Sequence, residues 1–93
     1  MKQGAPEDRV AEYQSRFREI ALRLADSAED VARTFEQSAS FHDLIAATDG
    51  HPLQAESVAR AQHEREVVAF ERAEAVRLRA LAERLRGRET QAR

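Results

Sequence analysis

Large apolar side chains recur at steps of three and four residues along the first half of the chain, which is the spacing of one face of an α-helix. The series consists of Val10, Tyr13, Phe17, Ile20, Leu24, Val31 and Phe35, with Ser27 filling the step before Val31. Pro6, followed by Glu7 and Asp8, indicates the helix start, because proline suits the first turn and acidic side chains stabilise the positive end of the helix dipole. The pattern predicts a helix over about residues 6–47, and its loosening near Ser38–Ser40 is compatible with a break there.

The strongest internal helix breakers lie near the middle of the chain. Gly50 can adopt the left-handed conformation that ends a helix, and Pro52 suits the opening of the next one. A turn is therefore predicted at residues 48–52. No Gly or Pro interrupts the next stretch, so a second helix is predicted over about residues 53–86, followed from Gly87 by a frayed tail, residues 87–93.

Laying the two predicted helices antiparallel, so that facing residue numbers add to about 101, brings large apolar residues together. The apolar positions of this register are Phe17, Ile20, Leu24, Val31 and Phe35 on the first helix and Val67, Phe70, Leu78, Leu81 and Leu85 on the second. Polar residues also meet polar ones, with Ser27 opposite Glu74 and Ser38 opposite His63. The fold class predicted is all-α, a single antiparallel helical hairpin over residues 1–93 with a coiled-coil-like seam.

Small residues form a second stripe on each helix and give a competing choice of seam, since small side chains let helix axes approach closely. The stripe consists of Ala21, Ala25, Ala28 and Ala32, and of Ala55, Ala59, Ala69, Ala73 and Ala80 with Val76 among them. In one interpretation the alanines form the hairpin contact and the large residues face a partner; in the other the roles are reversed. A lone hairpin leaves one stripe in water, so we expect a homo-oligomer, a dimer forming a four-helix bundle or a coiled-coil-like assembly.

Composition excludes several classes of protein and cellular compartment for this hairpin. The chain has no cysteine, which excludes a disulfide framework and a zinc knuckle. No stretch approaches the roughly 18 apolar residues of a membrane span, and residues 1–8 are polar and acidic, unlike a signal peptide. We therefore expect a cytoplasmic protein without a membrane partner.

Histidines and carboxylates are possible metal ligands, because helical bundles bind metals through inward-facing Glu-x-x-His pairs. No Glu precedes a His by three residues in this chain. Near the turn, His42, Asp43, Asp49 and His51 are better interpreted as caps and solvent-facing groups. We predict no metal, no cofactor and no enzymatic activity, because a two-helix seam offers no concave pocket for a substrate.

Charge is distributed unevenly, since residues 1–50 carry six basic and ten acidic side chains whereas the last turns of the second helix are basic. The candidate phosphate contacts are Arg77, Arg79, Arg84, Arg86 and Arg88. The net charge is −2, and a nucleic-acid partner is not expected. The basic end should instead lie beside the acidic side chains of the first helix, which are Glu12, Glu19, Asp26, Glu29 and Asp30.

The chain resembles the small helical hairpins of the WXG secretion family in length and in its turn near the midpoint. Gly50 corresponds to the glycine of the family's Trp-x-Gly turn, and Phe70 with Glu74 has the spacing of its Tyr-x-x-x-Asp/Glu motif, but the tryptophan is absent and the pair lies mid-helix. The leading hypothesis is a non-enzymatic protein-protein interaction or assembly module. The alternatives are a carrier or sensor that binds a metal or small ligand through His63, Glu74 and Ser27, and a secreted WXG-like hairpin.

Overall fold

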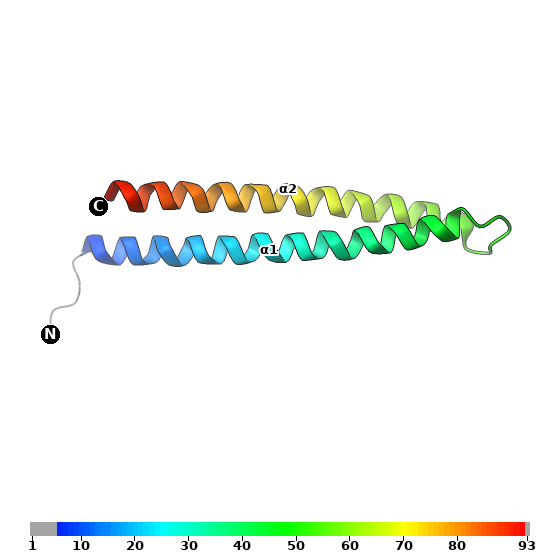
Figure 1. Ribbon diagram of the computed structural model, residues 1–93, viewed down its shortest axis with the longest axis horizontal. Helices are drawn as coiled ribbons and strands as arrows, with labels where there is room; N and C mark the ends of the chain where they lie inside the picture. Colours follow the sequence, from blue (N-terminus) through cyan, green and yellow to red (C-terminus); the bar gives the residue numbers. More distant parts are fainter. Residues whose placement is uncertain (1–5, 93) are drawn as a thin grey trace.

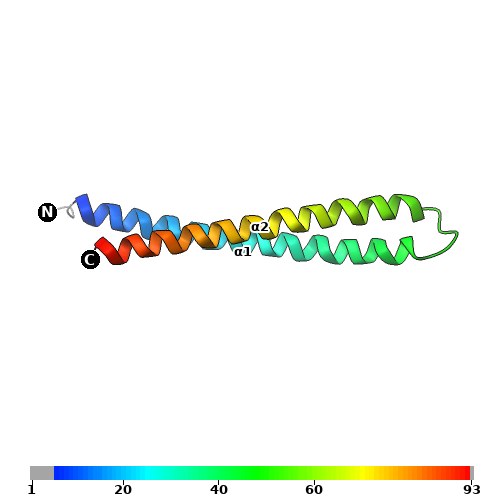
Figure 2. The ribbon, with the colours of Figure 1, turned by 90° about the horizontal axis from the view of Figure 1, so that it is seen from above.

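The computed structural model describes residues 6–92, and the side chains of residues 8–87, as two helices that lie antiparallel (Figure 1). Helix α1 spans Pro6–Ala46 and helix α2 spans Gln54–Ala92. The pair forms a rod with extents of 74 × 24 × 13 Å, and the helices cross near its middle (Figure 2). The predicted all-α helical hairpin is confirmed.

Helix α1 matches its predicted range to within one residue, whereas α2 runs further than the sequence predicted. Helix α1 passes unbroken through Ser38–Ser40, because Ala39 is buried in the contact with α2 and this packing overrides the looser apolar pattern. Helix α2 does not end at Gly87 but continues to Ala92. Glycine costs only about 1 kcal/mol relative to alanine inside a helix, which is not enough on its own to end α2.

The turn at residues 47–53 is held by its own side chains. Gly50 has a φ of +76°, the left-handed conformation predicted for it. The backbone N–H of Leu53 donates to His51 Nδ1 at 3.0 Å, and the Gln54 side-chain amide donates to the carbonyl of Ala46 at 2.8 Å. His51 and Gln54 thus satisfy backbone groups at the end of α1 and the start of α2, which fixes where the chain reverses.

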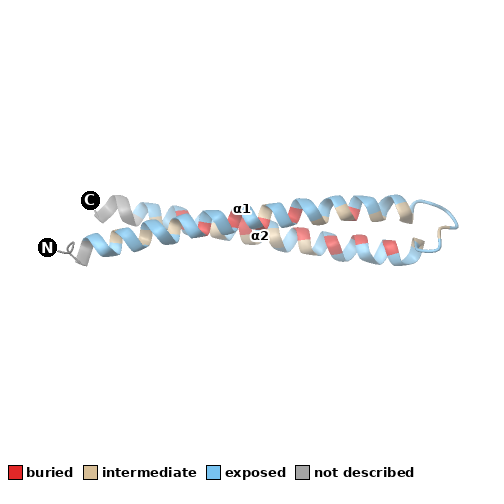
Figure 3. Cartoon of the chain, turned by 90° about the horizontal axis from the view of Figure 1, so that it is seen from below, coloured by how far each residue is buried: buried red, intermediate tan, exposed pale blue. Residues whose placement is uncertain are grey.

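The seam between the helices is built from small residues that repeat every seven positions. On α1 they are Ala21 and Ala28 together with Ala25, Ala32 and Ala39; on α2 they are Ala61, Val68, Ala75 and Ala82. Ala25 and Ala75 have no exposed surface, and Leu78 packs against the cluster that they form with Ala28. The buried positions follow the line of contact between the two helices (Figure 3). A seven-residue repeat of apolar positions is the signature of two helices that coil about each other.

The small-residue interpretation of the hairpin contact is therefore correct for α1 and wrong for α2. The alanines proposed for α2 are all exposed, as is Val76; they are Ala55, Ala59, Ala69, Ala73 and Ala80. The buried set on α2 instead repeats every seven residues and includes the polar Ser57 and Glu64.

Candidate interaction surface

The seam divides the hairpin into two broad faces of opposite character. On α1, Ile20 and Leu24 directly precede the seam residues Ala21 and Ala25, whereas Glu29 directly follows Ala28. Because successive residues of an α-helix are rotated by about 100°, residues before and after the seam project to opposite sides of it. The hairpin thus has one face with large apolar side chains and one with charges.

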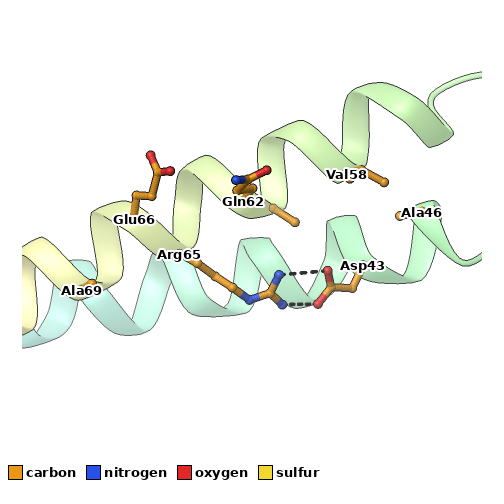
Figure 4. Close-up of a pocket in the computed structure, with 8 residues that line it drawn as sticks. Asp43, Ala46, Val58, Gln62, Arg65, Glu66 and Ala69 are labelled. Carbon is orange, nitrogen blue, oxygen red and sulfur yellow. Dashed lines mark hydrogen bonds and ion pairs between the residues drawn. The ribbon is translucent and has the colours of Figure 1, made fainter.

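The charged face is formed by acids of α1 and arginines of α2 that both repeat every seven residues. Its members are Glu29, Glu36 and Asp43 on α1 and Arg65, Arg72 and Arg79 on α2. Ion pairs on this face cross the seam at three levels of the described residues: Arg79 to Glu29 at 2.8 Å, Arg72 to Glu36 at 2.6 Å, and Arg65 to both carboxylate oxygens of Asp43 (Figure 4). Arg79 also contacts Asp26 at 3.4 Å. The charges of this face are therefore largely satisfied within one chain.

Electrostatics on the charged face reflect these pairs. The Arg79 hydrogen bond holds the pKa of Glu29 below its usual range, and the Arg65 hydrogen bond does the same for the pKa of Asp43. The same two contacts raise the pKa values of the arginines. Each group favours the ionised form of its partner across the seam, which keeps the face in its paired state at neutral pH.

The predicted complementarity between a basic α2 and an acidic α1 is confirmed for Asp26 and Glu29 through Arg79. The other acids named for it pair within their own helix. Glu12 binds Arg16 at 2.7 Å, Glu19 binds Arg23 at 2.8 Å, and Asp30 binds Arg33. These exposed pairs one turn apart stabilise α1 itself by a few tenths of a kcal/mol each.

The apolar face carries most of the large residues that the sequence assigned to a seam. We define this face by two seven-residue series on α1, one with Phe17, Leu24 and Val31 and the other with Tyr13 and Ile20. On α2 the corresponding residues are Val67, Leu81 and Phe70. Phe17 and Phe70 are 60% and 62% exposed, and Leu24 is 51% exposed. Isolated apolar residues on a surface are ordinary, whereas these side chains share one face of the hairpin.

The predicted seam residues differ in how far they are buried. Four are partly buried beside the alanines: Phe35, Val67, Leu78 and Leu85. The other six are exposed: Phe17, Ile20, Leu24, Val31, Phe70 and Leu81. The large residues thus border the hairpin contact rather than form it.

The predicted polar layer is brought together at one of its two levels. A shallow depression of about 290 Å³ on the apolar face is lined by Leu24, Ser27 and Val31 from α1 and by Glu74 and Leu78 from α2. Ser27 and Glu74 therefore lie side by side as the register predicted, although Ser27 is exposed and Glu74 pairs with Arg77 of its own helix. At the other level Ser38 is partly buried and His63 is exposed, so His63 is not the buried histidine of this hairpin.

The buried histidine is His42, which sequence reasoning considered only as a turn residue. Its Nδ1 lies 2.8 Å from Glu64 Oε1, with 16% and 10% of the two side chains exposed. This is a close contact rather than a well-aligned hydrogen bond, because among the described residues neither His42 Nδ1 nor the second carboxylate oxygen, Glu64 Oε2, has a hydrogen-bond partner. The signal that could have identified Glu64 is its place among Ala61, Val68 and Ala75, which continues the repeat of three and four residues along α2.

Side chains near the turn make separate contacts with other residues. His42 is engaged with Glu64, Asp43 with Arg65, and His51 with the backbone of Leu53. Within the part of the chain that the structure describes, no three histidine or acidic side chains come close enough to hold a metal ion. Neither helix there contains a span apolar and long enough to cross a bilayer.

A second surface depression, of about 530 Å³, lies beside the Asp43–Arg65 ion pair (Figure 4). Asp43 and Arg65 occupy one wall and already bind each other, and Val58, Ala46 and Ala69 supply apolar surface. It is open and has no converging set of unpaired polar groups, which a small-molecule site requires for orientation.

Comparisons with protein families, curated proteins and solved structures found no match. The apolar face is the feature of the hairpin from which a function can be argued.

Proposed function

We propose that this chain is a non-enzymatic helical assembly module whose apolar face packs against the helices of a second copy in a four-helix arrangement. The remaining helical surface would then be presented to another protein. The cytoplasm is the compartment expected for such a module.

One observation carries the proposal. The hairpin closes its own seam with alanines and leaves the larger side chains outside it, so the surface with the greatest capacity for apolar burial is unused within one chain. Burial contributes roughly 25 cal/mol per Å² of apolar surface, and a Phe or Tyr holds about 150–250 Å². The exposed parts of the aromatic rings alone therefore represent several kcal/mol per copy.

The charged face is a less favourable surface for a second copy than the apolar face. Its arginines and acids already make ion pairs across the seam, and a partner placed there would have to desolvate these pairs at a cost that the new contacts must offset. The apolar face imposes no such cost along Phe17, Leu24 and Val31.

The test is a pair of identical substitutions in α1. Leu24 lies on the apolar face and Leu44 is exposed elsewhere on the same helix, so Leu24→Ser and Leu44→Ser change helix propensity and polarity alike. Light scattering after gel filtration should give a dimer for wild type and Leu44→Ser, and a dimer at least roughly 30-fold weaker for Leu24→Ser. If both variants keep the wild-type mass, the apolar face is not the assembly surface.

A further inference from the structure

We propose that the second copy docks in one particular register, with the two α1 helices antiparallel across a two-fold axis that passes between Leu24 and Ser27. This inference rests on the proposed function, since it requires that the apolar face of one chain meets that of another. A two-fold interface is made of the same patch on both copies, so the patch must be complementary to itself when reversed.

The apolar stripe of α1 meets this requirement. Within the hairpin, residues of both seven-residue series of one helix meet those of the other, as in the cluster of Ala25, Ala28 and Ala75 against which Leu78 packs. In an antiparallel pair of helices each position of one series faces a position of the other series. Applying the same rule to two copies of α1 about this axis places Leu24 opposite Ser27 and Ile20 opposite Val31. The outer levels pair Phe17 with Thr34, Tyr13 with Ser38 and Phe41 with Val10.

Side-chain volume favours this register over its neighbours. Each of the three aromatic residues faces a small or β-branched residue, and large-against-small pairing lets facing helices interdigitate without strain. A shift by one seven-residue repeat in one direction sets Phe17 against Phe41, and a shift in the other carries the partner of Phe41 beyond Pro6, where α1 begins. The chosen axis also lies at the midpoint of Pro6–Ala46, so nearly the whole helix overlaps its copy.

Charge is complementary in the same arrangement. Arg16 and Asp30 border the apolar stripe, and the axis places Arg16 of each copy beside Asp30 of the other. Arg23 meets its own copy near the axis, where each guanidinium is neutralised by Glu19 at 2.8 Å. Both Arg16 and Asp30 are exposed and pair only within α1 in the single chain, so they are available to exchange partners.

The second helix supports the same axis independently. Two copies of α2 reversed about a point between Glu74 and Arg77 place Leu81 against Phe70 and set Glu74 against Arg77 of the other copy. This point lies within one helical turn of the level of the α1 axis, since Ser27 and Glu74 line the same depression. The Glu74–Arg77 pair of one helix can thus become two pairs between chains.

Interface size is adequate for a stable dimer. Tyr13, Phe17 and Phe41 are each about 60% exposed, and these three rings alone expose on the order of 300 Å² per copy. Ile20, Leu24 and Val31 add their own exposed surface, which brings the contact toward the roughly 800 Å² per partner of a standard interface.

The absence of native cysteine allows a direct test by disulfide formation. The double variant Ile20→Cys/Val31→Cys should form a covalent dimer on oxidation, because each new thiol faces the other residue type across the axis at disulfide distance. Each single variant should not, since Ile20 lies about 16 Å along the helix from its own copy. Covalent dimer from Ile20→Cys alone would indicate parallel helices, and dimer from Ile20→Cys/Leu24→Cys or Ser27→Cys/Val31→Cys alone would indicate a register shifted by one repeat; either result overturns the inference.

A label at the border of the interface gives a second measurement. Gln37 is exposed and belongs to the same seven-residue series as Arg16 and Asp30, and a spin label on Gln37→Cys should report an axial separation of about 35 Å between copies. A separation of about 24 or 45 Å marks the shifted registers and overturns the inference while the dimer, and so the proposed function, stands. A monomer by light scattering, for the unlabelled wild type at the same concentration, overturns both.

Discussion

The two broad faces of this hairpin differ in how far their side chains are satisfied within one chain. The charged face is completed within the chain, because Arg65, Arg72 and Arg79 each reach an acid across the seam. The apolar face is left open, with Phe17 and Phe70 each more than half exposed. Exposed ion pairs contribute little stability, about 0–1 kcal/mol each, so they orient the helices more than they hold them together. The large apolar side chains contribute little to the hairpin contact and remain accessible for the proposed assembly.

The alanine seam between the faces explains why the large residues are outside it. Ala25 and Ala75 leave no room for a longer side chain between the helices, and this close approach of the backbones displaces Leu24 and Leu81 to the border. The large apolar side chains therefore stay outside the helix contact only while the side chains within it are small.

The largest expected effect comes from enlarging the seam. Ala75→Leu should destabilise the fold by about 3 kcal/mol, because a buried alanine with no exposed surface cannot accept three further carbon atoms without separating the helices. Urea denaturation followed by circular dichroism measures it. Ala73→Leu, the same change at an exposed position two residues away, should stay within about 0.5 kcal/mol of wild type. Equal effects of the two changes would place the seam elsewhere on α2.

A smaller effect is expected from the buried polar pair. His42→Leu should cost about 2 kcal/mol, because it leaves the Glu64 carboxylate buried without its 2.8 Å partner. Adding Glu64→Leu should recover most of that loss, since a pair of apolar residues satisfies the seam as well as a polar pair does. A double-mutant cycle on denaturation midpoints is the appropriate measurement, and additive losses would show that the two side chains do not interact.

The charged face should give smaller changes still. Arg72→Ala removes the ion pair to Glu36 and should cost about 0.2–1 kcal/mol, less in high salt because the pair is exposed and screened. The control is Arg60→Ala, which removes an ion pair to Glu56 within α2 and leaves the seam crossing untouched. A loss of several kcal/mol from Arg72→Ala would mean that charge, rather than the alanine seam, holds the hairpin.

Acid should weaken the charged face in a defined direction. The pKa values of Glu29 and Asp43 are lowered by Arg79 and Arg65, so these carboxylates stabilise the fold when ionised, and that contribution is lost as the pH falls through their folded-state values. The denaturation midpoint should therefore fall more between neutral pH and about pH 3 for wild type than for Arg65→Ala/Arg79→Ala. Identical pH profiles would show that the two arginines do not couple to these acids.

Much of the fold was readable from the sequence because its signals are local. The repeat of three and four residues predicted the helices, and Gly50 predicted the turn between them. Once the turn is known, the antiparallel register follows, and it places Ser27 near Glu74. The helix ends were less predictable, since the continuation through Ser38–Ser40 depends on burial of Ala39 against α2, a contact between residues distant in sequence.

The choice of seam was harder for a physical reason. Large side chains give the strongest periodic signal, and alanine is common in any stable helix, so its placement carries little information on its own. On α2 the buried face is marked by the seven-residue repeat of Ala61, Val68, Ala75 and Ala82, and not by the other alanines of the helix. Glu64 lies on the same face, three residues after Ala61 and four before Val68. The same stripe of large residues can pack in a core or in an interface, so its periodicity predicts both arrangements equally.

The central claim, that the apolar face exists to pack against another copy, is tested most directly by the mass of the wild-type chain at equilibrium. Sedimentation equilibrium is the suitable method because, unlike elution volume, it does not depend on the 74 Å length of the rod. At micromolar concentrations the account predicts twice the 10.5 kDa mass of one chain, falling toward that of one chain on dilution. A single species of 10.5 kDa at all concentrations, with the helices intact, would contradict it.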